Sequence, residues 1–115
     1  MATFIRFEDI EAWQKARQST QVIYTITNPD KFGRDFSLKD QIRRASISIM
    51  SNIAEGFERE SIKEFSHFLS IAKGSAGEVE SQLYIAFDQN YITKQQFDDI
   101  FKISLRQQNM LHYEC

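Results

Sequence analysis

Hydrophobic residues recur at alternating steps of three and four along most of the chain, which is the spacing of one face of an α-helix. The clearest run lies between Ser61 and Asn90. Its apolar positions are Ile62, Phe65, Leu69, Ala72, Ala76, Val79, Leu83 and Ala86. This is also the heptad spacing of helices that pack nearly side by side. Shorter runs of the same kind precede and follow it. The pattern predicts four helices, at about 7–28, 38–55, 61–90 and 93–112.

Three breaks separate the predicted helices, and a helix-start motif follows each break. Each motif has a hydroxyl residue three positions before an acidic residue or a glutamine, and the hydroxyl residues are Ser37, Ser61 and Thr93. The hydroxyl and the side chain three positions later can both cap free N–H groups at the start of a helix. Gly56 is well placed as the residue just after a helix end, because glycine adopts the conformation required there. Short links favour antiparallel neighbours. The sequence therefore predicts an all-α, up-down-up-down four-helix bundle.

The length and composition fit a single domain over residues 1–115. Of the 115 residues, 42% are hydrophobic and ten are Phe, which is enough apolar material for a core. The net charge is −2, so the chain lacks the strong basic character of many nucleic-acid-binding proteins. Its single cysteine, Cys115, allows no internal disulfide. We find neither a signal-peptide pattern nor an apolar run long enough to span a membrane, and expect a cytoplasmic protein.

The third predicted helix holds more small and apolar residues than its hydrophobic face uses. Gly74 and Gly77 flank Ser75 in a thin patch that would let another backbone approach closely. Phe68 and Ile71 lie outside the main hydrophobic face. This surplus predicts a subunit interface with contributions from Phe68, Ile71, Gly74 and Ser75.

A polar stripe runs beside the hydrophobic face of the second predicted helix. Arg44, Ser48 and Asn52 follow one another at steps of four, and Glu55 is three positions further on. Buried polar groups need hydrogen-bond partners, so we expect a network that fixes helix register or subunit contacts. Arg44 is expected to pair with Glu78 of the third helix, because a guanidinium matches the two oxygens of a carboxylate.

Basic side chains concentrate in the middle of the chain. Residues 31–73 contain eight basic and six acidic side chains. Arg43, which we expect to face solvent, is grouped with Arg59, Lys63 and Lys73 as candidate contacts for weak, sequence-indifferent binding of RNA or DNA. An ordinary solvated helix surface is the simpler interpretation, although a ring of identical subunits would concentrate the charge.

The chain lacks the residue sets of a catalytic or metal site. Glu64 and His67 form one Glu-x-x-His unit, whereas a dimetal bundle needs two, and Asn109 stands where His112 would need its glutamate. His112 and Cys115 are close in sequence but have no third group to orient them. We therefore expect no catalytic residue, no metal and no cofactor, and a metal-dependent oxidase is the remaining enzymatic alternative.

The segment from Gln41 to Gly56 closely resembles the signature of a bacterial four-helix-bundle family, first met as proteins encoded in intervening sequences of 23S ribosomal RNA genes. Trp13 and residues 24–29 resemble the opening of that family. Positions that look like its second signature are Glu64, Phe65, Phe68, Leu69, Ile71–Ser75, Glu78, Gln82 and Leu83. The resemblance covers nearly the whole chain.

The resemblance implies a cytoplasmic homopentamer of up-down four-helix bundles, without enzymatic activity. A related branch, the accessory protein of diversity-generating retroelements, is a basic pentamer that works with a reverse transcriptase and nucleic acid, and this chain differs from it in its net charge of −2. The leading hypothesis is a non-enzymatic, homo-oligomeric binding or scaffold module, with a role in a nucleoprotein complex as one form of it. A nucleic-acid-binding ring is the alternative.

Overall fold

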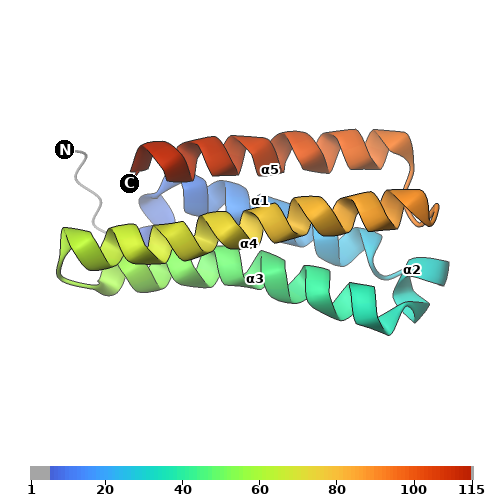
Figure 1. The fold of residues 1–115 in the computed structure, drawn as a ribbon, viewed down its shortest axis with the longest axis horizontal. Helices are drawn as coiled ribbons and strands as arrows, with labels where there is room; N and C mark the ends of the chain where they lie inside the picture. Colours follow the sequence, from blue (N-terminus) through green and yellow to red (C-terminus); the bar gives the residue numbers. More distant parts are fainter. Residues whose placement is uncertain (1–5, 115) are drawn as a thin grey trace.

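Four long helices lie side by side along the long axis of the computed structural model, and the links between them lie at its two ends (Figure 1). The structure describes residues 6–114, and their side chains as far as Ser104. Its elements are a 3-10 turn η1 (Phe7–Asp9) and the helices α1 (Glu11–Ile26), α2 (Asp30–Arg34), α3 (Phe36–Glu58), α4 (Ile62–Asp88) and α5 (Lys94–Glu114). The described residues contain no strand, which confirms the all-α class. None of the described helices is long and apolar enough to cross a membrane.

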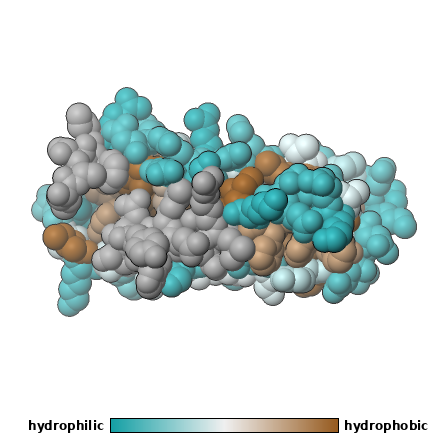
Figure 2. Space-filling view, turned by 90° about the horizontal axis from the view of Figure 1, so that it is seen from above, coloured by the Kyte–Doolittle hydropathy of each residue, from teal (hydrophilic) through white to brown (hydrophobic). Residues whose placement is uncertain are grey.

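The core consists largely of the residues that the spacing predicts. The buried positions of the two central helices are Leu38, Ile42, Ala45, Ile49 and Ile53 of α3 and Leu69, Ala72, Ala76, Val79, Leu83 and Ala86 of α4. Ile62 is an exception, because it is the first residue of α4 and its side chain is 78% exposed. Seen from the α5 side, hydrophilic residues cover most of the described surface, and hydrophobic ones show between them (Figure 2).

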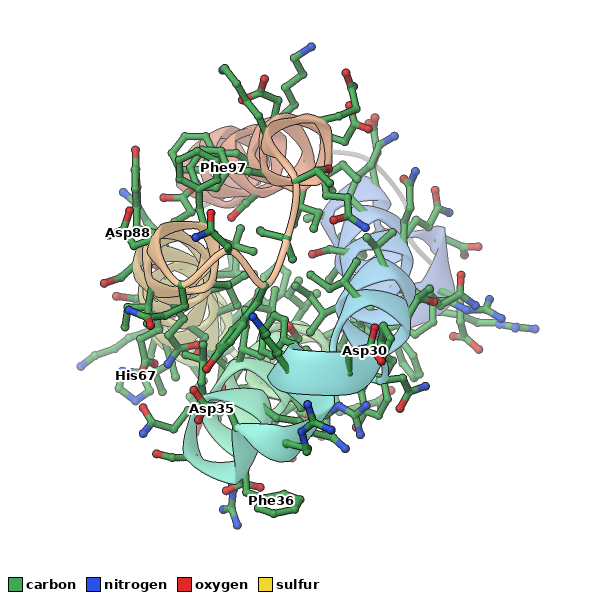
Figure 3. All side chains as sticks on the ribbon, turned by 90° about the vertical axis from the view of Figure 1, so that its right-hand side faces the viewer. Asp30, Asp35, Phe36, His67, Asp88 and Phe97 are labelled. Carbon is green, nitrogen blue, oxygen red and sulfur yellow. The ribbon has the colours of Figure 1, made fainter. Side chains whose placement is uncertain are left out.

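The four long helices occupy the corners of the bundle. α3 packs against α1 and α4, and α5 packs against α1 and α4, so α1 and α4 lie at opposite corners (Figure 3). Among the described residues, the contact between α3 and α4 is the most extensive.

Two of the three predicted helix starts are confirmed. Ser61 Oγ accepts the Glu64 N–H at 3.1 Å. Thr93 Oγ1 accepts the Gln96 N–H at 3.1 Å, and the Gln96 side chain accepts the Thr93 N–H at 2.8 Å. The third start is wrong by two residues.

Asp35, not Ser37, caps α3. Its Oδ1 atom accepts the Leu38 N–H at 3.1 Å, which places Ser37 inside the first turn. An aspartate at this position satisfies one of the free N–H groups of the turn, and its negative charge interacts favourably with the positive end of the helix dipole.

The first predicted break contains a short helix, α2. Phe32 of α2 is 1% exposed and packs against Tyr91, with the two rings 5.1 Å apart. Gly33 lies so close to the Asn28 carbonyl that a Cβ at this position would collide with the oxygen. The glycine therefore permits a tight return of the chain between α1 and α3, and α2 closes this end of the core.

Gly56 does not end its helix. It is buried within α3, which continues to Glu58. A Cβ on Gly56 would lie 2.8 Å from Cβ of Phe68 and 3.0 Å from the ring of Phe65, both on α4. The prediction of a C-terminal glycine was wrong, because this glycine serves the close approach of two helices.

The predicted first helix, 7–28, consists of η1 followed by α1. Arg6 and Asp9 cap the short turn, and Ile10 separates it from α1. At the other end of the chain, Leu105, Leu111, His112 and Cys115 lie outside the residues whose side chains the structure describes.

Candidate functional site

The residues singled out on the second and third predicted helices meet along one face, between α3 and α4. Gly56 lies against Phe68 near one end of this contact, and Ser48 lies against Ser75 near its middle. Towards the other end, Arg44 and Glu78 line the same groove. We refer to this surface as the α3–α4 face.

A hydrogen-bond chain crosses the α3–α4 face. Asn52 Nδ2 donates to the Ser48 carbonyl oxygen at 2.8 Å and to Ser48 Oγ at 3.0 Å. Ser75 Oγ donates to Ser48 Oγ at 2.8 Å. Ser75 is 5% exposed, so it belongs to the interior of the folded chain and is not available to a second copy, contrary to its predicted place in a subunit interface.

The predicted Arg44–Glu78 pair is not present. Arg44 Nε donates to Asp40 Oδ2 at 2.8 Å, and the Arg44 side chain is 78% exposed. Position 44 lies on the outer side of α3, where a carboxylate one turn away satisfies the guanidinium in water. Glu55 pairs in the same way with Arg59, at 3.0 Å, and takes no part in the Ser48 network.

Arg43, which was expected to face solvent, joins α3 to the end of α1. Its Nε donates to Thr27 Oγ1 at 2.9 Å, and its Nη2 donates to Asn28 Oδ1 at 3.1 Å. The guanidinium carbon lies 4.3 Å from the centre of the Tyr24 ring, within the range of a cation–π contact. Arg43 is thus a structural residue and not a free basic contact.

A groove of about 270 Å³ opens between α3 and α4. It is lined by Gln41, Arg44, Ala45 and Ser48 of α3 and by Glu78 and Gln82 of α4. Gln82 is 9% exposed, and its Oε1 atom is buried without a hydrogen-bond partner. Buried polar atoms nearly always have a partner, so this acceptor is an exception beside the groove.

Apolar side chains stand exposed beside the groove. Ile71 and Ile85 of α4 are 40% and 46% exposed. A methyl group added to Gly74 would meet no atom within 4 Å. Residues 71, 74, 78 and 85 share one side of α4 by helical spacing, so the isoleucines and the open glycine lie on the same surface as Glu78.

Part of the apolar surplus of α4 packs against α5 within the same chain. Tyr84 and Phe87 contact Phe97 of α5, with ring centres 5.0 and 5.3 Å apart, and Phe101 stacks on Phe97 at 5.3 Å. These rings hold α4 to α5. The sequence pattern did not distinguish them from interface residues, because both kinds flank the same hydrophobic face.

Two of the four predicted nucleic-acid contacts are occupied by other interactions. Arg43 contacts the end of α1, and Arg59 pairs with Glu55 and lies 5.0 Å from the centre of the Phe68 ring. Lys63 and Lys73 are exposed on α4, and no carboxylate of the described residues forms an ion pair with either.

Glu64 and His67 lie on the outside of the bundle. Both are exposed, and His67 points away from the core, with its ring edge against Phe68 (Figure 3). Within the part of the chain that the structure describes, no three His, Cys, Asp or Glu residues gather closely enough to hold a metal ion.

A contact between Tyr91 and Asp35 at the α2 end of the bundle was not predicted from the sequence. Tyr91 donates its hydroxyl to Asp35 Oδ2 at 2.9 Å, and this hydrogen bond raises the pKa of Tyr91. The two residues line a shallow hollow with Lys31, Arg34 and Gln89. Asp35 also caps α3. An aspartate three residues before Leu38, the first buried position of the helix, was the sequence signal that could have identified this cap.

A comparison with models of known protein families identifies the family of this chain. The family model of the 23S rRNA-intervening sequence proteins matches residues 8–113. The chain belongs to this family. Its match confirms the resemblance seen in the Gln41–Gly56 motif.

A solved structure supports the same assignment. A protein of unknown function from the S23 ribosomal protein family of Bacteroides thetaiotaomicron is 27% identical to this 23S rRNA-intervening sequence protein. The similarity covers 89% of this chain and 95% of that chain, with a TM-score of 0.81. A comparison with curated proteins finds no match.

Proposed function

We propose that this family member is a non-enzymatic, homo-oligomeric binding or scaffold module, built from up-down-up-down four-helix bundles that associate through the α3–α4 face. The resemblance implies five copies and a cytoplasmic location. The proposal assigns the chain no chemical reaction, and it leaves the biological partner of the assembly to be identified.

The observation that carries the proposal is the exposure of Ile71 and Ile85 beside a groove that Glu78 and Gln82 line. Removing apolar surface from water contributes about 25 cal/mol per Å². Single exposed apolar residues are common on soluble proteins, whereas several on one face are typical of an interface. The open surface at Gly74 adds to this, since it offers no side chain to hinder a second backbone.

A matched pair of substitutions tests the proposal. Ile71→Asp places a charge on the α3–α4 face, whereas Ile62→Asp places the same charge at the start of the same helix, where Ile62 is 78% exposed. We expect Ile71→Asp to reduce the mass measured by light scattering at micromolar concentration, and Ile62→Asp to leave it unchanged. Circular dichroism checks that both variants remain helical.

Two results would count against the proposal. A wild-type chain that is monomeric at these concentrations removes the oligomer itself. An Ile71→Asp variant that assembles as well as Ile62→Asp removes the α3–α4 face as the interface, while the oligomer stands.

The nucleic-acid alternative retains Lys63 and Lys73, which form no ion pair with a carboxylate in the described part of the chain. Binding by surface lysines comes from counterion release and weakens steeply with salt. A titration of labelled RNA at low and physiological salt separates the two hypotheses. The scaffold proposal expects no saturable binding at physiological salt, whereas binding that is lost in the Lys63→Ala, Lys73→Ala double variant would favour the alternative.

A further inference from the structure

We propose that a second copy of the chain completes the α3–α4 groove with hydrogen-bond donors from the outer face of its α1. This inference rests on the proposed function, because it names the surface that the partner copy contributes. The groove of a single chain contains acceptors without donors, and the exposed side of α1 carries N–H donors.

The groove offers acceptors that its own subunit does not satisfy. Gln82 Oε1 is buried without a donor, and an unsatisfied buried acceptor destabilises the separate chain. Glu78 lies on the same groove, and its expected partner Arg44 is bound to Asp40 instead. A group with N–H donors, and a positive charge for Glu78, therefore fits this groove best.

The surroundings of the groove favour a protein surface over a small ligand. A small polar molecule would fill about 270 Å³ but would leave Ile71 and Ile85 in water. A second subunit covers the groove and the isoleucines together. The Ala45 and Ser48 side chains are short, which leaves depth for a long side chain to enter.

The outer face of α1 carries suitable side chains. Arg17, Gln18 and Gln21 are exposed, and each bears N–H donors at the end of a flexible chain. Glu11 is the sole acidic residue in α1, at its first position. No ion pair engages Arg17 within the described residues. The charge and the hydrogen-bonding groups of this face thus complement those of the groove.

The positions of the two surfaces suit a head-to-tail arrangement. α1 and α4 lie at opposite corners of the bundle, so one copy presents the groove on one side and the donors on another (Figure 3). Contacts between two different surfaces of identical chains form rings when the rotation closes. The inference therefore predicts a cyclic assembly and not a two-fold dimer through like surfaces.

A charge exchange within one chain tests the pairing. Arg17→Glu places a carboxylate opposite Glu78, and Glu78→Arg places a guanidinium opposite Arg17. We expect each single variant to weaken association at least about tenfold, because like charges meet in the interface. The double variant restores the opposite charges and should return to within about threefold of wild type, where a factor of ten corresponds to about 1.4 kcal/mol. Lys63→Glu is the control for a reversed charge outside this face and should have no effect.

A second variant checks the role of Gln82. Gln82→Leu removes the unsatisfied acceptor, so the separate chain should become more stable to urea while association weakens. This pair of opposite effects distinguishes a partner-completed site from a residue that merely supports the fold.

The outcomes separate this inference from the proposed function. If the wild-type chain assembles but the double variant fails to recover what the single variants lose, the α1 pairing is wrong and the oligomer stands. The pairing is equally wrong if neither single variant weakens association. A wild-type chain that never associates overturns both proposals.

Discussion

Arg43 and Thr27 join the second long helix to the end of the first, with Arg43 Nε donating to Thr27 Oγ1 at 2.9 Å. Thr27 is itself buried, and its hydroxyl donates to the Ile23 carbonyl oxygen at 2.7 Å. The guanidinium thus ends a hydrogen-bond chain that runs from the last turn of α1 to α3. This contact holds the α1–α2 link in place against the body of the bundle.

The first prediction compares Arg43 with its neighbour. Arg43→Ala should lower the free energy of unfolding by about 1.5–3 kcal/mol, because it removes charge-assisted hydrogen bonds to partly buried groups. Arg44→Ala should lower it by less than about 0.5 kcal/mol, since an exposed pair one helical turn apart contributes little. Urea denaturation of the two variants measures the difference. Equal effects would contradict the structural role of Arg43.

The second prediction concerns the close approach of α3 and α4. Gly56→Ala should destabilise the fold by about 1–3 kcal/mol, because the new methyl group meets Phe68 at 2.8 Å in a packed interior. Gly74→Ala adds the same methyl group where no atom lies within 4 Å, so it should stabilise the separate chain by up to about 1 kcal/mol through helix propensity. Thermal unfolding at a concentration where the chains are separate compares the two. If both glycines tolerate alanine, Gly56 has no packing role.

The third prediction concerns the pH dependence of stability through Glu80. Burial raises the pKa of Glu80 above its ordinary value of 4.5, and the neighbouring Ser104 hydroxyl opposes this. The folded state therefore holds the proton more tightly than the unfolded state, and the stability falls as the pH rises from about 4.5 through the raised pKa. Glu80→Gln should raise the melting temperature at neutral pH.

The pH profile supplies the check on Glu80. The advantage of Glu80→Gln over wild type should disappear below the ordinary pKa of glutamate, where both side chains are uncharged. Glu60→Gln, at an exposed position in the link before α4, should show no such profile. An advantage that persists unchanged at low pH would show that the charge of Glu80 is not its source.

The core could be predicted from the sequence, because apolar spacing directly reports which side of a helix faces its neighbours. Leu38, Ile42, Ala45, Ile49 and Ile53 are all buried as predicted. Ile62 fits the same spacing but is exposed, since α4 begins there and the opposing helix has ended. Periodicity defines a direction around the helix, whereas the length of the packed region depends on the neighbouring helix.

The roles of Arg43 and Arg44 could not be assigned from the sequence. The two residues lie on opposite flanks of the hydrophobic face of α3, and spacing alone does not say which flank faces α1 and which faces α4. The tertiary arrangement places Arg43 towards α1 and Arg44 on the rim of the α3–α4 groove. The same ambiguity concealed the contact of Ser48 with Ser75, which needs the relative register of two helices.

The mass of the wild-type chain in solution tests the central claim most directly. One chain has a mass of 13.5 kDa. Sedimentation velocity over a range of micromolar concentrations should show a single assembled species, and the resemblance to the family predicts a mass close to five chains. A species of another size would keep the oligomer and correct the number of subunits. A species of one chain at every concentration would contradict the account, because the exposed isoleucines of the α3–α4 face would then have no partner copy to cover them.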